Sequence, residues 1–338
     1  MKIIKPYAEI MDAHFGVDVL KKIELVGRTC YKSTDHITKD SAPKFVGNLI
    51  NAGHEAMVEH GSFCFMISFD QYRSLQELVA NLSTHLKVDG EVYKPFLRFT
   101  NEEKRTLVSA NIRAWREFFT ECVHQIHNLP VYFKSFIFDN PILFPEFQRK
   151  SLFQNGYFPQ AKPMFREDLI GEVELMVHCD VTAKFVIDRG VSHEVVRHRP
   201  ASFAQESTRY CNYSKNKFGN EITVIQPCFW NPDEDIVKPY PLNKYNFWKK
   251  HCIIAEADYF MLLEMGATPE EARDVLPTST KTELIMTANL GEWKHFFSLR
   301  ACNFTGKAHP QMLEVGQPLL DSFKDEFKAD GIFADMSY

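Results

Sequence analysis

The 338-residue sequence predicts an α+β protein folded as a single domain over residues 1–338. Three observations support this prediction. Apolar residues make up 45% of the chain, which is enough to build a sizeable core. Segments with the two-residue period of strands occur beside segments bounded by helix-capping residues. No internal repeat occurs, and no change of composition defines a domain boundary.

The first elements lie in the N-terminal quarter of the chain. Residues 41–55 predict a helix with Ser41 as its N-cap and Gly53 just past its end. In the segment that follows, large apolar side chains recur on one side, as in a strand with one buried face. These side chains are Phe63, Phe65, Ile67 and Phe69.

Residues 81–180 differ in character and are predicted to be an insertion that packs on the same core. One helix is expected around residues 107–123. A Pro- and Phe-rich irregular run follows over residues 139–165. Structureless segments of such length are uncommon inside a compact domain, so this region is interpreted as an elaboration of the fold.

A strand is predicted at residues 181–188, followed by a turn and a short helix. Ser192 is the expected N-cap of that helix, and Pro200 ends it because the residue before a proline disfavours helical geometry. The basic triplet of residues 197–199 therefore lies at a helix C-terminus, where cations interact favourably with exposed carbonyls. That effect accounts for one arginine but not for the whole basic group.

The C-terminal third has the clearest capping signals. In residues 268–277, Thr268 is the predicted N-cap of a short helix and Glu271 completes a capping box. A strand is expected at residues 282–288. Asn289 then caps a helix on which Arg300 extends the face of its aromatic residues, Trp293 and Phe297.

Charge and cysteine content restrict the class of protein. The formal net charge of -5 and the pI near 6.2 argue against a general nucleic-acid-binding protein, which needs a basic surface. The eight cysteines have no zinc-site spacing, so no metal is expected. Neither a signal peptide nor a membrane-spanning run is recognised, so a cytoplasmic protein without membrane contact is expected.

Arginines from separate segments form the main candidate for a functional site. If their side chains converge, the partner carries phosphate or a delocalised anion, because guanidinium groups bind oxyanions in a fixed geometry. Ser207 fits a phosphate ligand better than a nucleophile, since no GxSxG or SxxK pattern surrounds it. His54 and His198 are possible acids or bases. The arginines are Arg197, Arg199, Arg209, Arg273 and Arg300.

The spacing of Arg-His-Arg at 197–199, seven residues and then Ser207 resembles the signature of the flavin-dependent thymidylate synthases. Four further segments resemble motifs of that family in the correct order. They are GRTCYKS (27–33), HEAMVEH (54–60), EARDVLP (271–277) and NLGEWKHFFSLR (289–300), the last followed by AHPQ (308–311). The resemblance covers roughly residues 20–80 and 180–330, and the intervening region is similar to an insertion found in longer members.

The resemblance implies a fold and an activity. Members have an α+β fold with a mixed or antiparallel sheet flanked by helices, and they form homotetramers with active sites between subunits. The implied reaction is the reductive methylation of dUMP to dTMP. Methylenetetrahydrofolate donates the carbon, and FAD carries a hydride obtained from NADPH.

The resemblance also implies roles for individual residues, with Arg300 as the catalytic residue that stabilises charge on the pyrimidine. The implied flavin-binding residues are His54, Ala56, Glu59, Arg197, His198, Arg199, Gln205, Asn289 and His295. The implied dUMP-binding residues are Glu194, Arg197, Gln205, Ser207, Arg209, Arg273 and Arg300. Four positions depart from the commonest family pattern, namely Ala56, Glu194, Ala204 and Gly291.

Three alternatives stay open at this point. The first is thymidylate synthesis through a cysteine nucleophile, for which the chain offers Cys228 after Pro227. The second is a related C5-methylating or hydroxymethylating enzyme that acts on another pyrimidine nucleotide. The third is a flavin- or nucleotide-binding protein without catalysis, or an RNA-binding protein, which the acidic balance disfavours.

Overall fold

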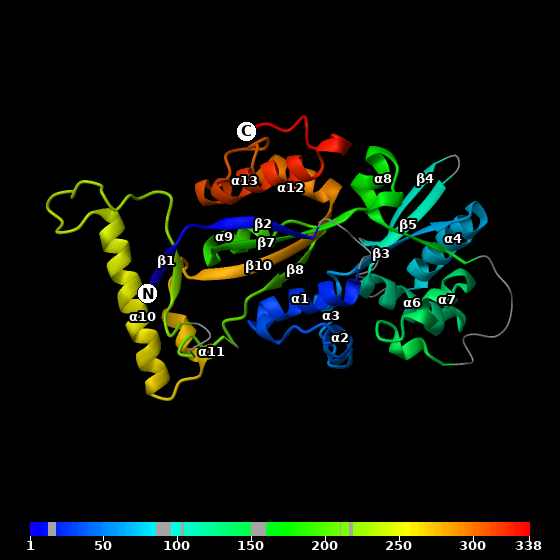
Figure 1. The fold of residues 1–338 in the computed structure, drawn as a ribbon, viewed down its shortest axis with the longest axis horizontal. Helices are drawn as coiled ribbons and strands as arrows, with labels where there is room; N and C mark the ends of the chain where they lie inside the picture. Colours follow the sequence, from blue (N-terminus) through cyan, green and yellow to red (C-terminus); the bar gives the residue numbers. More distant parts are fainter. Residues whose placement is uncertain (13–17, 86–95, 103–104, 150–159, 210, 216–218) are drawn as a thin grey trace.

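The computed structural model describes residues 1–12, 18–85, 96–102, 105–149, 160–209, 211–215 and 219–338. In this part of the chain, two four-stranded sheets and a small two-stranded sheet are combined with helices, which confirms the α+β class (Figure 1). The helices are α1 (Val19–Tyr31), α2 (Ala42–Asn51), α3 (Glu55–Val58), α4 (Phe69–His85), α6 (Ile112–Ile126), α7 (Lys134–Asp139), α8 (Gly171–His178), α9 (Arg189–Val195), α10 (Lys244–Glu264), α11 (Pro269–Ala272), α12 (Leu290–Arg300) and α13 (Pro310–Glu326).

The central sheet is antiparallel throughout. Its strand order is β2 (Tyr7–Asp12), β7 (Asp180–Asp188), β10 (Lys281–Asn289) and β8 (Ser202–Gln205). Most residues of β7 and β10 are buried, because helices cover both faces of these strands. The β7–β10 ladder pairs Lys281 with Asp188 at one end and Asn289 with Asp180 at the other.

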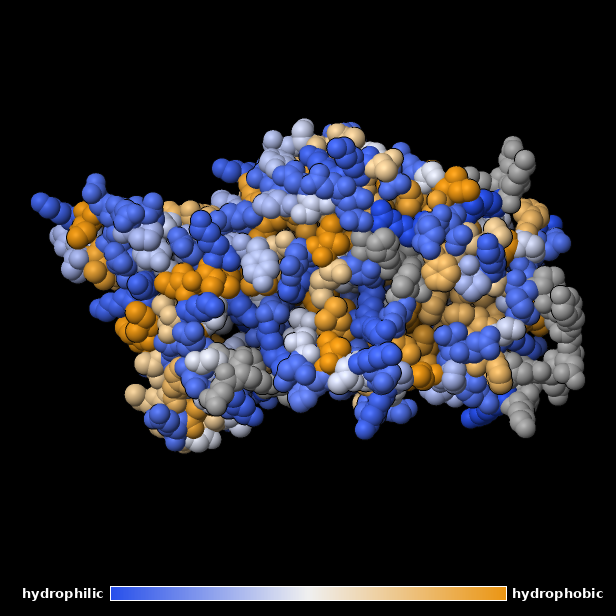
Figure 2. All heavy atoms as spheres, viewed as in Figure 1, coloured by the Kyte–Doolittle hydropathy of each residue, from blue (hydrophilic) through white to orange (hydrophobic). Residues whose placement is uncertain are grey.

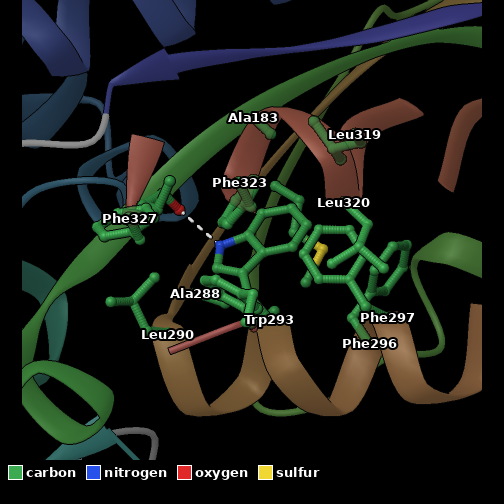
Figure 3. Close-up of a cluster of buried hydrophobic side chains, with 14 of the residues drawn as sticks. Ala183, Ala288, Leu290, Trp293, Phe296, Phe297, Leu319, Leu320, Phe323 and Phe327 are labelled. Carbon is green, nitrogen blue, oxygen red and sulfur yellow. Dashed lines mark hydrogen bonds between the residues drawn. The ribbon is translucent and has the colours of Figure 1, made fainter. Parts of the chain in front are cut away.

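Helices α12 and α13 cover one face of the central sheet, and α1 covers the other (Figure 1). The α12 side contains an aromatic cluster built around Trp293, Phe297 and Phe323 (Figure 3). The Trp293 indole is fully buried, and its Nε1 donates a hydrogen bond to the Val181 carbonyl at 3.0 Å. This bond fixes α12, and with it Asn289 and Arg300 at its two ends, against strand β7.

The second sheet is also antiparallel, in the order β4 (Arg98–Glu102), β5 (Arg105–Asn111), β3 (Ser62–Ile67) and β6 (Lys162–Met164). Three of its four strands come from the predicted insertion, residues 81–180. Its main hydrophobic cluster includes residues of α6 and also of α1 and α2, so the insertion packs on the N-terminal helices. The interpretation of the chain as a single domain stays a prediction.

The third sheet is a parallel pair of β1 (Lys2–Ile4) and β9 (Thr223–Ile225). Helix α10 packs beside this pair through a small cluster that includes Tyr259 and Val224. In Figure 1 the helix projects from the central sheet at the left. None of the helices in the described ranges has the length and apolar character required to span a membrane.

Several local predictions are confirmed. Thr268 caps α11, its hydroxyl accepts from the Glu271 amide, and the Glu271 side chain accepts in return, which completes the capping box. Asn289 caps α12 by accepting from the Glu292 amide at 2.8 Å. These signals are reliable because both partners lie within one turn of helix.

Other predictions are wrong in detail. The segment expected to be helical from residue 107 is strand β5 up to Asn111, and α6 begins only at Ile112. Residues 107–111 form a strand because they pair with β3 and β4. The local sequence does not reveal this long-range pairing. The helix after β7 begins at Arg189 with Asp188 as its N-cap, and Ser192 lies inside it.

Two N-terminal details also differ. Strand β3 ends at Ile67, and Phe69 is 58% exposed at the start of α4. Both faces of β3 are covered, since Cys64 and Phe65 point into different hydrophobic clusters. Ser41 precedes α2 as predicted, but its hydroxyl does not cap that helix and donates to Glu24 Oε2 at 2.9 Å instead.

Candidate functional site

Strand β8 connects the two places at which the predicted site residues gather. It runs antiparallel to β10, with Ser202 opposite Thr287 and Gln205 opposite Leu284. The basic triplet precedes β8, and Ser207 follows it. Three residues of strand span roughly 10 Å, so β8 covers the middle of β10 and runs from the side of its Asn289 end toward its Lys281 end.

At the Asn289 end of β10 lies a small polar cavity, which we call the Asn289 pocket. Its volume is about 20 Å³, which is room for one water molecule. Residues of both four-stranded sheets meet here. Its polar lining includes Glu59, Arg98, Asn111, Asp180, Asn289 and Glu292.

Two histidines, His198 and His295, lie beside this pocket near Glu292 of its lining. His198 Nε2 is 3.4 Å from Glu292 Oε2, and the His198 imidazole is buried. The His295 ring lies 5.3 Å from that of His198, measured between centroids, and is itself exposed. The structure therefore brings together His198, Asn289 and His295, all predicted flavin-binding residues.

A buried ion pair forms one wall of the Asn289 pocket. Arg98 Nη1 and Nη2 donate to the two carboxylate oxygens of Asp180 at 2.6 and 2.9 Å. Burial alone would raise the pKa of Asp180, but the charge and hydrogen bonds of Arg98 hold it below its ordinary value. Asp180 thus stays ionised, and the pair joins β4 of the insertion to β7 of the central sheet.

Glu59 reaches the pocket from the loop after α3. Its Oε1 accepts from Arg113 Nη1 at 2.7 Å, and the next residue, His60, hydrogen-bonds through Nδ1 to Thr287 Oγ1 at 2.7 Å. His54 and Ala56 are exposed at the start of this segment, and the His54 ring contacts the Tyr31 hydroxyl at 3.4 Å. They do not line the pocket of this chain.

Toward the Lys281 end of β10 lie four of the residues predicted to bind dUMP, namely Gln205, Ser207, Arg209 and Arg273. Gln205 Nε2 donates to Ser192 Oγ in α9 at 2.9 Å, which fixes the end of β8. Two residues further, the half-buried Ser207 precedes Thr208, whose hydroxyl lies 3.4 Å from Arg273 Nη1. Arg209 is exposed, and its Nε lies 3.0 Å from Glu270 Oε1.

Arg300, the last residue of α12, contacts α9. Its Nη1 lies 3.5 Å from Glu194 Oε2, in the helix that starts where β7 ends. Both side chains are partly exposed, so the guanidinium is held by a carboxylate without being enclosed. Charge stabilisation on an incoming anion is the chemistry that such a group can perform.

A buried charge network anchors the segment between Gln205 and Ser207. Glu206 is 2% exposed, and its Oε2 lies 2.8 Å from Lys281 Nζ and 3.7 Å from Lys32 Nζ. Lys281 also pairs with Glu283 at 3.0 Å. Burial alone would lower the pKa of Lys281, but these two carboxylates hold it above its ordinary value.

The residues also fit a phosphate-bearing flavin cofactor. Arg197 and Arg199 are exposed, and no carboxylate pairs with either guanidinium within the described part of the chain. Two unpaired arginines in one turn suit a pyrophosphate. In the Asn289 pocket, Asn111 Nδ2 and Glu292 Oε2 are buried without a hydrogen-bond partner, which suits the polar edge of a ring system.

Sequence reasoning missed several of these residues. Arg98 and Asn111 lie in the region interpreted as an elaboration, and nothing local links them to residues 180 or 289. Glu206 directly precedes Ser207 in the signature segment, but only the structure reveals its two lysine partners. A usable signal existed for Asn111, an N-cap residue directly before a helical pattern.

Comparison with known proteins agrees with the motif resemblance over the C-terminal part of the chain. A family model described as thymidylate synthase complementing protein matches residues 170–327. The chain is 36% identical to the flavin-dependent thymidylate synthase of Pyrococcus furiosus over 133 residues, which are 39% of this chain and 49% of that protein.

Two other relatives carry the same name. The Thermococcus kodakarensis protein is 31% identical over 154 residues, 45% of this chain and 57% of that protein. The Geobacter sulfurreducens protein is 31% identical over 134 residues, 39% of this chain and 53% of that protein. The chain thus spans about half the length of the curated relatives it matches. Over residues 170–327, the resemblance to the flavin-dependent thymidylate synthases that the motifs predict is confirmed.

Proposed function

We propose that this protein is a flavin-dependent thymidylate synthase. It converts dUMP to dTMP with methylenetetrahydrofolate as carbon donor, and FAD carries the hydride from NADPH. The observation that carries the proposal is the position of the signature segment along β8, which has His198 and Asn289 toward one end and Ser207, Arg209 and Arg273 toward the other. The family match over residues 170–327 supports it independently.

The flavin contacts are assigned to the Asn289 end. Arg197 and Arg199 would hold the FAD phosphates, and His198, Asn289 and His295 would contact the flavin. Glu59, with His54 and Ala56, would line the flavin and folate region. When bound, the flavin supplies the hydride for the reduction.

The nucleotide contacts are assigned to the Lys281 end. Ser207 and Arg209 would bind the dUMP phosphate, with Glu194 and Gln205 beside it. Arg273 and Arg300 would reach the pyrimidine, and Arg197 would lie near both ligands. Arg300 would stabilise negative charge that develops on the uracil ring, because a guanidinium stays protonated and cannot remove a proton.

A homotetramer with active sites between subunits is part of the proposal. The Asn289 pocket is too small to enclose a flavin, so a second copy would be needed to complete the site. Figure 2 shows hydrophobic residues on the surface over α10. This helix exposes apolar side chains suited to an interface. They are Phe247, Ile253, Ile254 and Met261.

The fold of the family, a cytoplasmic location and the absence of nucleic-acid and membrane partners belong to the same proposal. The eight cysteines are all free thiols, and seven of them are buried, which suits a reducing compartment. The route through a cysteine nucleophile is disfavoured. Cys228 is exposed at the surface. Loss of some hydration of its thiol, together with the charge of Glu314, raises the pKa of the thiol above the ordinary value. The thiolate fraction is therefore lowered.

The test is an anaerobic assay of tritium release from C5-labelled dUMP, with NADPH and methylenetetrahydrofolate, run with and without added FAD. Release that depends on FAD, together with dTMP as product, is expected. Parallel assays with dCMP and UMP separate the enzyme from one that modifies another pyrimidine. A preparation that binds FAD and bleaches with NADPH, but converts none of the three nucleotides, would mark a binding protein without this activity.

A further inference from the structure

Asn111 lies where the insertion meets the Asn289 pocket. It is the last residue of β5, 3% exposed, and its Oδ1 accepts a hydrogen bond from the Ala114 amide at 2.7 Å, capping α6. This bond fixes the orientation of the side-chain amide. Its Nδ2 is consequently a buried donor in the pocket lining, with no hydrogen-bond partner.

The strand register explains why an insertion residue reaches this place. Asn111 stands opposite Ser62, three residues after Glu59, and Arg98 stands opposite Ser109. Asn111 and Arg98 are therefore at the same end of the second sheet. The ion pair between Arg98 and Asp180 holds that end against the Asn289 end of β10, because Asp180 is the register partner of Asn289.

The pocket contains further unsatisfied polar atoms. Two other lining residues, Glu292 and Arg98, have the atoms Oε2 and Nε buried without a hydrogen bond, although Glu292 Oε2 lies 3.4 Å from His198 Nε2. Natural proteins rarely leave buried donors and acceptors unpaired, and such groups are usually satisfied by water or by a bound molecule. The pocket is open enough for one small group, so the polar edge of a larger molecule fits it better than the whole molecule does.

We propose that Asn111 is a cofactor-binding residue supplied by the insertion, and that its Nδ2 donates a hydrogen bond to an acceptor atom on the edge of the flavin ring system. This inference rests on the proposed function. It gives the insertion a direct part in the active site, since β4 and β5 together build one wall of the flavin contact.

Three substitutions separate the donor from the helix cap. In Asn111→Ser the hydroxyl still accepts from the α6 amide, but the amide donor is lost. In Asn111→Asp the cap and the side-chain size are kept while the donor is replaced by an acceptor. Asn111→Ala removes both cap and donor. Asn243→Ser is the matched control, since Asn243 caps α10 by the same bond, to the Asn246 amide.

FAD affinity is measured by fluorescence titration of each apoprotein, and the thermal midpoint of each variant without FAD is measured in parallel. Asn111→Ser is expected to keep its midpoint and to weaken FAD binding about tenfold, which corresponds to one hydrogen bond of about 1.4 kcal/mol. Asn111→Asp is expected to weaken it further, because a carboxylate repels an acceptor. Asn243→Ser is expected to bind FAD as the wild type does.

The outcomes distinguish the inference from the proposed function. If the wild type binds FAD and both Asn111→Ser and Asn111→Asp bind it equally well, Asn111 only caps α6 and the inference is overturned. Loss of affinity in Asn111→Ala alone has the same meaning. If Asn111→Ser does not fold, the affinity of Asn111→Asp decides. A wild type that binds no FAD refutes the proposed function itself.

Discussion

Glu206 and Lys281 form a buried ion pair, with 2.8 Å between Oε2 and Nζ, directly beside the residue predicted to hold the nucleotide phosphate. The pair fixes the chain between Gln205 and Ser207 to the first residue of β10. Arg189 Nη2 donates to the Glu206 carbonyl at 3.1 Å and adds a second anchor. A buried charge network therefore sets the position of the loop that carries Ser207 and Arg209.

Replacing Glu206 by Gln should destabilise the protein. Lys281 keeps Glu283 as a partner, but it loses a buried charge-assisted bond. We expect the free energy of unfolding to fall by about 1–3 kcal/mol. Urea titration followed by circular dichroism measures the change. Glu270→Gln is the control, because its pair with Arg209 is about half exposed and such pairs contribute less than about 1 kcal/mol. Equal stability of Glu206→Gln and wild type would contradict this account.

Arg300→Lys should separate binding from turnover. Lysine keeps the positive charge at the end of α12 but lacks the planar donor fork of arginine. Since Arg300 contacts Glu194 and is not among the residues that line the Asn289 pocket, FAD binding should be retained. We expect kcat for dTMP formation to fall roughly 10²- to 10³-fold, the usual cost of losing one charge-stabilising donor. Steady-state kinetics with saturating FAD measures this, and unchanged kcat would remove Arg300 from the mechanism.

Two buried histidines predict a loss of stability in mild acid. Burial, with the nearby charge of Lys22 for His60 and of Arg98 for His178, lowers the pKa of both rings to about 3. The unfolded chain binds their protons near pH 6.5, and the folded chain does not. The contribution of the two neutral rings to stability is therefore fully present above pH 6.5. As the pH falls from 6.5 to 3, the free energy of unfolding should decrease by up to about 1.4 kcal/mol per pH unit for each ring.

Urea midpoints at pH 7.5 and 5.5 test this dependence. His60→Asn can keep the bond to Thr287 Oγ1 without a titrating ring, so the difference between the two midpoints should become smaller. His36→Asn is the control, since His36 is 71% exposed and is in contact with water before and after unfolding. The explanation fails if His60→Asn, like the control His36→Asn, shows the same pH dependence as the wild type.

The parts of the site that could be predicted depend on neighbours in sequence. Asn289 and Thr268 cap helices within one turn, and both predictions are confirmed. The Arg98–Asp180 pair joins residues 82 positions apart, across two sheets, and no local pattern reveals such a contact. At Asn111 the N-cap signal was local and was overlooked, whereas the strand before it, residues 107–111, is decided by the pairing of β5 with β3.

The pairing of Arg209 with Glu270 predicts a substitution that strengthens nucleotide binding. If Arg209 binds the dUMP phosphate, Glu270 competes for its guanidinium, with Nε and Oε1 now 3.0 Å apart. Glu270→Gln removes the competing charge. We expect the Kd of dUMP to fall about two- to fivefold, which corresponds to an exposed ion pair of up to about 1 kcal/mol.

Isothermal titration calorimetry of dUMP into the FAD-loaded protein measures the effect. Glu271→Gln is the matched control at the adjacent position, because the Glu271 side chain is engaged in the capping box with Thr268 and glutamine preserves that box. Arg209→Ala should raise the Kd at least tenfold. If Glu270→Gln binds dUMP as weakly as Arg209→Ala does, Glu270 orients the guanidinium for the phosphate and does not compete for it.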